Sequence, residues 1–504
     1  MLGCLPTAAA ELVKTLGAGR MGGAAYDTAW VARASNALRQ PTLVWLLGHQ
    51  HADGSWGGMI EHTYDRVLST LAALVALASQ PESRSAYASR IERGCRYLDR
   101  AMRRLPGERG PEPVAFELIA PRLIADARQV GLAAPDLPPE VARRAVDVPH
   151  TGRELDVYSP AAAASFSLEM LGQGLDPSRG ARLLGTTGSI AASPAATAAF
   201  LLHGPSRAAE QYLALAAAST PDGSLPTVYP FDLFETAWVL FNFGIGQVAV
   251  PHCPAAFGRL MQAWRLGRVG WSSDVPIQDA DDLAVVFALL DAAGLAPDAS
   301  RFELYEREGH FATLPMEHTP SVSTNAHVLY ALGRAAEFPA RTRWIQKIRA
   351  YLRDSQQPDG SWCDKWHLSP YYATAHAIFA LADLDEEAVR RARRWLRDSR
   401  NSSGMWGVGQ GTPEETAYAI QGLLFARVGR ASDPVPGPPD LLLEAVPFLL
   451  DAWRGSPQHP EQWVAKVLFA PDLIIESALI SALQLCALGT GSARCIAQET
   501  LAWT

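Results

Sequence analysis

The sequence is poor in cysteine and in charged residues, and it has no long uninterrupted apolar run. Its six cysteines are scattered over 504 residues without a CxxC pair, which argues against a disulfide framework or a thiolate metal site. No apolar stretch approaches the roughly 20 residues that a membrane-spanning helix needs. The N-terminus lacks the basic start and apolar segment of a signal peptide. We therefore expect a cytoplasmic protein without a membrane span.

Basic residues are outnumbered by acidic ones. The 44 Lys and Arg residues face 52 Asp and Glu residues, for a net charge of −8. This balance argues against nucleic acid or an anionic membrane surface as the main partner. An anionic small molecule would then need a local basic pocket. A chain of this length with 48% hydrophobic residues fits two domains with large cores.

Alternating strand patterns are also lacking. Apolar residues instead recur at spacings of three and four, as at Leu71, Leu74, Val75 and Ala78, and Gly, Pro, Asp and Ser separate the apolar segments. This spacing is typical of many medium-length helices joined by short turns. The sequence predicts an all-α protein.

A short motif is repeated along the chain. Gln50–Trp56 (QHADGSW) recurs as Gln356–Trp362 (QQPDGSW), and Arg400–Trp406 (RNSSGMW) keeps the tryptophan. An Asp-Gly turn followed by an aromatic residue suits a helix-loop-helix unit whose Trp fills the seam to the next unit. We expect such units to stack into α/α toroids, with the repeat tryptophans as structural plugs.

Candidate catalytic residues cluster in the segment Gly270–Phe287 (GWSSDVPIQDADDLAVVF). Asp279, Asp281 and Asp282 precede an apolar run there. Carboxylates this close raise one another's pKa, and burial raises it further, so one of them can remain a carboxylic acid. The alternative is an acidic first turn of a helix, where Asp is favoured by capping and by the helix dipole.

The Asp-Ala-Asp-Asp segment resembles the DxDD signature of class II terpene cyclases. Further segments resemble blocks of that family in the same order over nearly the whole chain: AYDTAWVA (25–32), QHADGSWG (50–57), YDRVLSTLAALVA (64–76), VYPFDLFE (228–235), DKWHLSPYYATAH (364–376) and EETAY (414–418). The chain is most similar to the actinobacterial members, which include halimadienyl and copalyl diphosphate synthases. The resemblance implies two α-barrel domains, named β and γ. Residues 1–38 would begin β, 39–226 would form an inserted γ, and 227–504 would complete β.

The resemblance also implies a reaction. Asp281 would protonate the terminal alkene of a linear prenyl diphosphate, and the cation would close rings while the diphosphate is retained. Asp279 and Asp282 would keep Asp281 protonated, and Asn325 would hydrogen-bond it, although a helix-cap role for Asn325 is equally common. The expected substrate is geranylgeranyl diphosphate, giving a bicyclic diphosphate of labdane, halimadane or clerodane type. Farnesyl diphosphate, giving drimenyl diphosphate, is the alternative.

Further site residues follow from the same resemblance. The aromatic candidates for stabilising a cation are Tyr229, Trp238, Trp271, Trp366, Tyr371, Tyr372 and Tyr418. The basic candidates for the diphosphate are Arg66, Lys365 and Arg153. Mg²⁺ is the expected cofactor, and Glu108 and Glu112 are its candidate ligands, although the acidic motif of plant relatives is not intact there. A downstream class I synthase or phosphatase would act on the product.

Other functions fit the sequence less well. Class I terpene synthases need a DDxxD motif, and Asp281-Asp282 is followed by Leu283, Ala284 and Val285. Squalene–hopene cyclases share the toroids but carry more complete repeats and a membrane-docking patch. A glycoside hydrolase on a similar toroid would use paired carboxylates but would not explain the ordered blocks. A non-catalytic toroid that binds a prenylated partner is the alternative outside enzymes.

Overall fold

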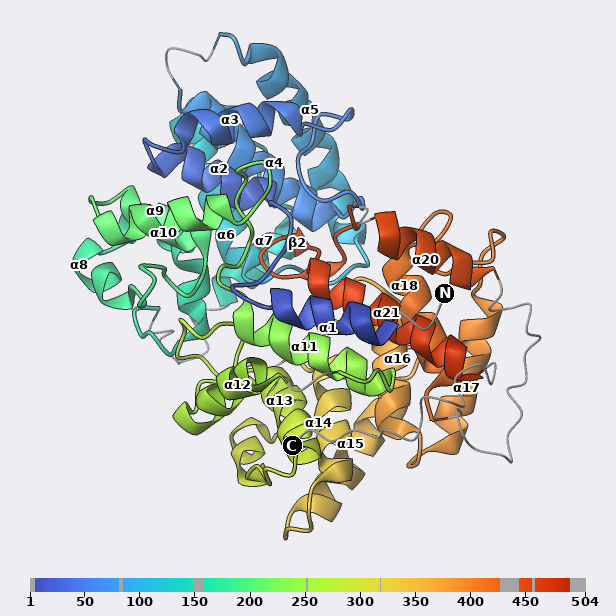
Figure 1. Ribbon diagram of the computed structural model, residues 1–504. Coiled ribbons are helices and arrows are strands. Elements are labelled where there is room, and N and C mark those ends of the chain that lie inside the picture. The colour runs from blue at the N-terminus through green and yellow to red at the C-terminus, as the bar shows by residue number, and fades with distance from the viewer. Residues whose placement is uncertain are drawn as a thin grey trace.

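The computed structural model describes residues 5–80, 85–147, 157–250, 253–317, 319–426, 444–455 and 458–489. Helices dominate these residues (Figure 1), and the all-α prediction is confirmed. The helices of the first half are α1 (Leu5–Thr15), α2 (Ala25–Ala34), α3 (Arg39–Gly48), α4 (Thr63–Ala78), α5 (Ala88–Arg104), η2 (Leu105–Gly107), α6 (Phe116–Gln129), α7 (Pro139–Asp147), η4 (Ala163–Gly174), α8 (Pro177–Gly180), η5 (Ala181–Leu183), α9 (Pro194–Leu201) and α10 (Arg207–Ala218).

The second half continues the helical pattern and adds one small hairpin. Its elements are α11 (Asp232–Ile245), α12 (Pro254–Leu266), α13 (Ala280–Ala292), η6 (Ala299–Tyr305), α14 (Val322–Arg334), α15 (Arg341–Ser355), α16 (Pro370–Leu381), α17 (Glu386–Asp398), α18 (Pro413–Leu424), α20 (Ala445–Gly455), β1 (Trp463–Val464), β2 (Leu468–Phe469) and α21 (Asp472–Gly489). The two strands pair antiparallel.

The helices form two rings, each with an inner and an outer layer. In the first, α2, α4, α6, η4 and α9 contact one another in a closed circuit, with α3, α5, α7 and α10 outside. In the second, α11, α13, α14, α16, α18 and α21 close the circuit, with α12, α15, α17 and α20 outside. Figure 1 shows the first ring above the second.

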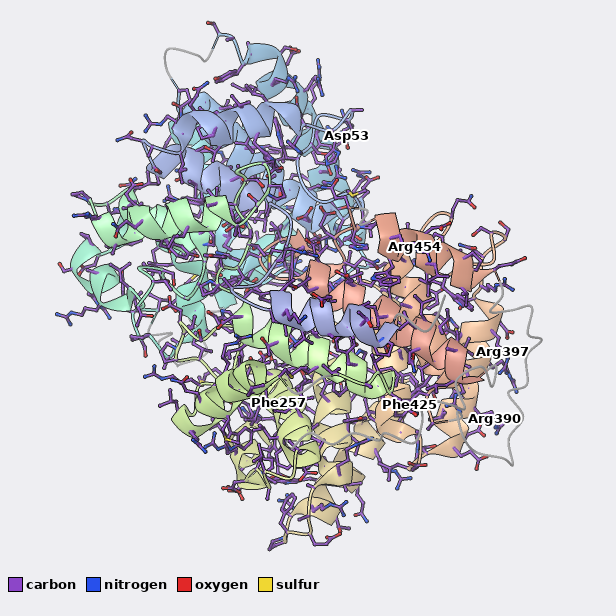
Figure 2. The ribbon with its side chains drawn as sticks, viewed as in Figure 1. Asp53, Phe257, Arg390, Arg397, Phe425 and Arg454 are labelled. Atoms are coloured by element: carbon purple, nitrogen blue, oxygen red, sulfur yellow. The ribbon has the colours of Figure 1, made fainter. Side chains whose placement is uncertain are left out.

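Sequence pattern separates inner from outer helices. After its first acids, α13 is apolar around its whole circumference, which is typical of a buried helix. Every residue from Ala280 to Leu290 is indeed buried. In α17 (EEAVRRARRWLRD) only one stripe is buried, and Figure 2 shows Arg390 and Arg397 of this helix at the periphery. α21 is long and apolar enough to cross a membrane by length and composition, but 78% of it is buried as an inner helix.

The repeated tryptophans are structural plugs, as predicted. The indole N–H groups of Trp56, Trp362 and Trp406 each donate to the carbonyl ten residues earlier, at 2.6–2.7 Å, at the end of an outer helix. Their backbone N–H groups donate to a threonine hydroxyl on the following inner helix. All three side chains are fully buried. Each repeat therefore fastens an outer helix to the next inner helix.

The buried residues divide into two hydrophobic cores. Leu5–Met21 belong to the core of the second ring, whereas Ala24–Ala32 belong to the core of the first. The chain thus passes from the second core to the first between Met21 and Ala24, before the domain boundary predicted at residue 38. The reason is that α2 packs on α4 and α9 rather than on α1. Later segments contribute to both cores: Phe166 and Phe200 belong to the second core, and Val467 belongs to the first. The predicted domain boundaries themselves stay a prediction.

The hairpin of β1 and β2 joins the two rings. Lys466, at its turn, is fully buried, and its ammonium donates to the Glu169 carboxylate, the Ser193 hydroxyl and the Phe166 carbonyl at 2.6–2.8 Å. Glu169 also accepts from the Tyr26 hydroxyl at 2.8 Å. A buried ammonium with three oxygen partners is stable only while its counter-charge is present.

We expect Lys466→Met to destabilise the protein by about 3 kcal/mol or more, because it leaves the Glu169 carboxylate buried without its cation. The thermal midpoint measures the effect, and it should fall by several degrees. Lys14→Met is the matched control, since Lys14 pairs with Glu11 on the exposed face of α1 and such pairs contribute little. Equal midpoints for the two variants would contradict the inferred role of the buried network.

Candidate active site

Three carboxylates are buried at the start of α13. Asp279 is the N-cap residue of this helix, and its carboxylate accepts the backbone N–H of Asp282 at 2.8 Å. Asp279, Asp281 and Asp282 are only 4%, 8% and 3% exposed. The segment is thus both an acidic helix start and a buried acid cluster, because the positive end of a helix dipole favours carboxylates there.

Burial changes the titration of two of these acids. It raises the pKa of Asp279 to about 6, and the charge of Asp281 adds to the rise, while hydrogen bonds from Asp282 oppose it. Burial, and then the charge of Asp279, raises the pKa of Asp282 well above its ordinary value. The Asp282 Oδ1 atom also has no hydrogen-bond partner among the described residues. Burial and mutual charge thus favour the protonated form within the Asp279–Asp282 pair.

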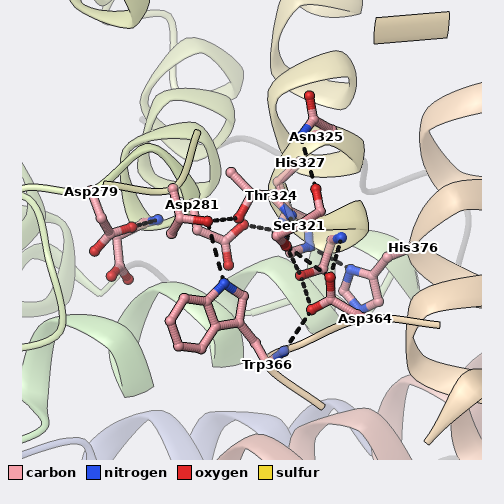
Figure 3. Close-up of polar contacts among 12 residues, drawn as sticks. Asp279, Asp281, Ser321, Thr324, Asn325, His327, Asp364, Trp366 and His376 are labelled. Atoms are coloured by element: carbon pink, nitrogen blue, oxygen red, sulfur yellow. Dashed lines mark hydrogen bonds and ion pairs between the residues drawn. The ribbon is translucent and has the colours of Figure 1, made fainter. Parts of the chain in front are cut away.

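Asp281 is the start of a chain of hydrogen bonds through two histidines. Its Oδ1 atom lies 2.6 Å from Nδ1 of His327 on α14, and Nε2 of His327 lies 2.6 Å from Nδ1 of His376 on α16. Figure 3 shows the three side chains converging from their helices. Both histidines are buried. Burial, and then the nearby His327, lowers the pKa of His376 well below its ordinary value, so His376 is neutral.

The predicted contact between Asn325 and the acid is wrong. The Asn325 amide accepts the backbone N–H of Phe311 at 2.8 Å and donates to the carbonyls of Phe311 and Ser321. His327 takes the position next to Asp281 instead. Two residues along a helix turn the side chain by about 200°, so Asn325 and His327 point to opposite sides of α14. Both stand in the segment SVSTNAHV, and the sequence alone did not single out the histidine.

The three acids line a cavity. The cavity lies between the two rings, and its lining is Val114, Ala163, Phe166, Val228, Phe231, Phe234, Trp271, Asp279, Asp281, Asp282, Thr313, Leu314, Trp366, Tyr372, Trp463, Val464, Ala465 and Phe469. Apart from the acids it is mostly aromatic and aliphatic, and such a wall excludes water.

Three of the predicted aromatic residues line this cavity. Trp271, Trp366 and Tyr372 are all lining residues. The indole of Trp366 is held by a hydrogen bond to the Thr313 hydroxyl at 3.3 Å. The Asp364 carboxylate accepts the backbone N–H of Trp366 and fixes the chain beside it (Figure 3). The Trp366 ring is therefore positioned by polar contacts with Thr313, which also lines the cavity, and with Asp364, which does not.

Two further predicted aromatics lie behind the lining. The Trp238 indole donates to the Tyr372 hydroxyl at 3.2 Å and stacks on the Phe234 ring at a centroid distance of 3.9 Å. It also packs edge-on against His327 at 5.5 Å. Tyr418 packs edge-on against Tyr372 at 5.1 Å. Trp238 and Tyr418 thus support lining residues.

Tyr229 and Tyr371 are not lining residues. The Tyr229 ring packs near Tyr212, at 6.3 Å, toward the first core. The Tyr371 hydroxyl donates to the carbonyl of Ser399 at 3.2 Å, away from the acids. Tyr371 and Tyr372 are neighbours on α16, so a turn of about 100° separates their side chains and only Tyr372 faces the cavity.

Sequence reasoning missed several aromatic lining residues. Phe231 and Phe234 stand in the family-like block at 228–235, and Trp463 and Phe469 stand outside every block. The hairpin residues Trp463 and Phe469 reach the cavity because the hairpin closes the gap between the rings. No local pattern in a two-residue strand predicts that placement.

The structure does not gather the predicted basic residues at one point. The Arg66 guanidinium is buried and donates to the Ser55 hydroxyl at 2.7 Å, inside the first ring. Lys365 forms an ion pair with Glu317 and lies 5.0 Å from the Trp366 ring centroid, so it is near the cavity. Arg153 lies outside the described residues. Neither Arg66 nor Lys365 is a lining residue.

The two predicted metal ligands already have partners. Glu108 accepts the backbone N–H groups of Thr63, Arg109 and Gly110. Glu112 forms an ion pair with Arg144. Over the described part of the chain, no three His, Cys, Asp or Glu side chains are grouped as a metal site. Glu108 and Glu112 therefore do not make a metal site by themselves.

Comparison with known proteins agrees with the acid-and-aromatic cavity. Residues 311–427 match the squalene-hopene cyclase C-terminal domain. The chain is 33% identical to a type B diterpene cyclase of Mycobacterium tuberculosis, over 92% of this chain and 95% of the relative. It is 32% identical to a copalyl diphosphate synthase of Streptomyces cyslabdanicus, over 91% of each. The chain belongs to the bacterial class II diterpene cyclases.

A solved structure also supports membership of this family. The fold of this cyclase matches that of the ent-copalyl diphosphate synthase from Streptomyces platensis with a TM-score of 0.75 and 28% identity, over 96% of this chain and 99% of that one. The two-domain all-α architecture is thereby confirmed, and the chain is an enzyme.

Replacing His327 by Phe should lower the cyclisation rate about 100-fold or more, because the acid loses the group that contacts its Oδ1 atom. The rate constant per folded molecule and the thermal midpoint measure this. Asn325→Leu is the comparison: it should cost about 2 kcal/mol of stability by leaving the Phe311 backbone groups unpaired, with a smaller rate effect. A larger rate loss for Asn325→Leu than for His327→Phe would restore the original assignment.

Asp279→Asn should make the cyclase less sensitive to rising pH. The pKa of Asp279 is about 6 in the folded protein, above its ordinary value, so its contribution to stability is greatest at low pH and is lost as pH rises through 6. Asn caps a helix as well as Asp and does not titrate.

The free energy of unfolding of wild type relative to Asp279→Asn should therefore fall by on the order of 1 kcal/mol between pH 5 and pH 7.5. Denaturant titrations at both pH values measure the difference, and groups common to both proteins cancel. A difference that is constant or rises with pH would contradict the raised pKa.

Proposed function

We propose that this cyclase converts geranylgeranyl diphosphate into a bicyclic diphosphate of labdane, halimadane or clerodane type. The observation that carries the proposal is the buried acid chain Asp281–His327–His376 beside a cavity lined mostly by aromatic and aliphatic side chains. The relatives' names, diterpene cyclase and copalyl diphosphate synthase, support a substrate of diterpene length that keeps its diphosphate.

The first step is proton transfer from Asp281 to the terminal alkene. An alkene is a very weak base, so the acid must be protonated beforehand and its carboxylate must be stabilised afterwards. The contact of Asp281 with His327 stabilises the carboxylate, and the apolar wall withholds water that would compete for the proton. The alkene electrons form the new C–H bond and leave a tertiary cation at the next carbon.

The cation then closes two rings and loses a proton. Each ring forms when the next alkene attacks the cationic carbon, so the positive charge moves along the chain. Phe234, Trp271, Trp366 and Tyr372 present rings along the cavity, and each cation–π contact can contribute about 2 kcal/mol when it is desolvated. Loss of one proton at the end balances the one added, so the reaction is an isomerisation.

We further propose that Mg²⁺ accompanies the diphosphate as part of the substrate complex. The diphosphate oxygens and water would supply most of its ligands, as is common for this ion, because Glu108 and Glu112 are engaged elsewhere. When bound, Mg²⁺ would neutralise the diphosphate charge. The product keeps the diphosphate, so a class I synthase or a phosphatase would act next.

The test is incubation of the purified enzyme and Mg²⁺ with geranylgeranyl and farnesyl diphosphates separately, followed by dephosphorylation and gas chromatography with mass detection. We expect a bicyclic alcohol from geranylgeranyl diphosphate. Asp281→Asn should give none, with an unchanged circular dichroism spectrum, because the amide cannot donate a proton of comparable acidity.

Each other outcome has a defined meaning. A bicycle only from farnesyl diphosphate would shift the substrate to the shorter chain, and only linear prenols from both would contradict the proposal. Turnover by Asp281→Asn would remove Asp281 as the acid. A parallel incubation with EDTA should be much slower, and an undiminished rate there would mean that basic side chains alone hold the diphosphate.

A further inference from the structure

His376 is buried next to the acid but does not touch the cavity. Its Nδ1 atom faces His327 at 2.6 Å, and its Nε2 atom has no hydrogen-bond partner among the described residues. Its ring is surrounded by the rings of Phe241, Tyr372 and Phe379, at centroid distances of 5.9, 4.2 and 5.1 Å. The proton-transfer step involves Asp281 and His327, and His376 reaches it only through its contact with His327.

The surroundings of His376 determine where its single proton lies. A neutral imidazole carries one N–H and one bare nitrogen. A proton on Nε2 would be a buried donor without an acceptor, whereas a proton on Nδ1 is donated to His327. Buried N–H groups are very rarely left unpaired, and bare acceptors are left so somewhat more often. The proton of His376 therefore belongs on Nδ1.

This placement fixes the tautomer of His327. Its Nε2 atom accepts from His376, so a neutral His327 carries its own proton on Nδ1. That proton points to Oδ1 of Asp281 at 2.6 Å. Oδ1 then acts as acceptor, and the acid's proton must lie on Oδ2, the other carboxyl oxygen of this cavity-lining residue.

The opposite arrangement would be unproductive. With its proton on Nε2, a neutral His327 would have a bare Nδ1 atom, and this atom would draw the proton of Asp281 onto Oδ1 and away from the cavity. We propose that His376 is a positioning residue that donates from Nδ1 to His327, and so directs the proton of Asp281 toward the substrate. The proposal rests on the proposed function for its kinetic consequence, but its tautomer is a property of the protein alone.

The tautomer is measured by nitrogen NMR of protein labelled with ¹⁵N at histidine, without substrate. The His327 signals are assigned by their loss in His327→Phe. We expect a pyrrole-type shift for Nδ1 of His327 and a pyridine-type shift for its Nε2. The reverse pattern, or two protonated nitrogens on His327, would overturn the proposal.

The kinetic test compares two replacements of His376. Asn places an amide N–H near the position of Nδ1, whereas Phe keeps a ring but donates nothing. We expect His376→Phe to lower kcat about 10- to 100-fold with little change in KM, as for other residues that orient a reacting group through one hydrogen bond. His376→Asn should recover most of that loss.

Equal loss in the Asn and Phe variants would overturn the donor role. Thermal midpoints of both variants show whether a loss merely reflects repacking, and the NMR on wild type decides the tautomer even if His376→Phe fails to fold. If wild type turns over neither prenyl diphosphate, the proposed function fails while the tautomer is still decided. The two failures are therefore distinguishable.

Discussion

The contact of Asp281 with His327, 2.6 Å long and out of water, is the interaction on which the cyclase site depends. An acid that protonates an alkene must hold its proton in the resting enzyme and then remain stable as a carboxylate. A hydrogen bond to the carboxylate meets the second requirement without adding a free charge to the cavity.

The packing of helices in the second ring sets the distance between Asp281 and His327. Asp281, His327 and His376 lie on α13, α14 and α16, which are consecutive in the inner circuit. The rotation of α14 is fixed by Asn325, whose amide is held by the backbone of Phe311 and Ser321. The repeat tryptophan Trp362 fastens α15 to α16. Residues that never touch the cavity thus align the hydrogen-bond chain inside it.

Features of the structure are predicted best from the sequence where their pattern lies within a single segment. The acidic segment, the helical spacing and the three repeat tryptophans each have a local pattern with a local cause, and the structure bears out the helices and the plugs. Trp271, Trp366 and Tyr372 were found because they stand in or beside family-like blocks.

The remaining features depend on relations between distant segments. The choice between Asn325 and His327 requires the rotation of α14 about its axis. Trp463 reaches the cavity only because the hairpin spans two rings, and the partners of Lys466 are about 300 residues away in sequence. Tyr371 and Tyr372 look alike in the chain, but only one faces the cavity.

The pairing of Lys466 with Glu169 explains why a buried lysine is compatible with a reaction that passes through carbocations. The Lys466 ammonium lies 4.5 Å from the centroid of the Phe166 ring, and that ring lines the cavity. An unpaired ammonium there would repel a carbocation strongly, since little water screens the charge. Glu169, which is not a lining residue, neutralises Lys466, so the wall presents a ring rather than a net positive charge. The ion pair that joins the two rings therefore also removes a positive charge that would repel a carbocation in the cavity.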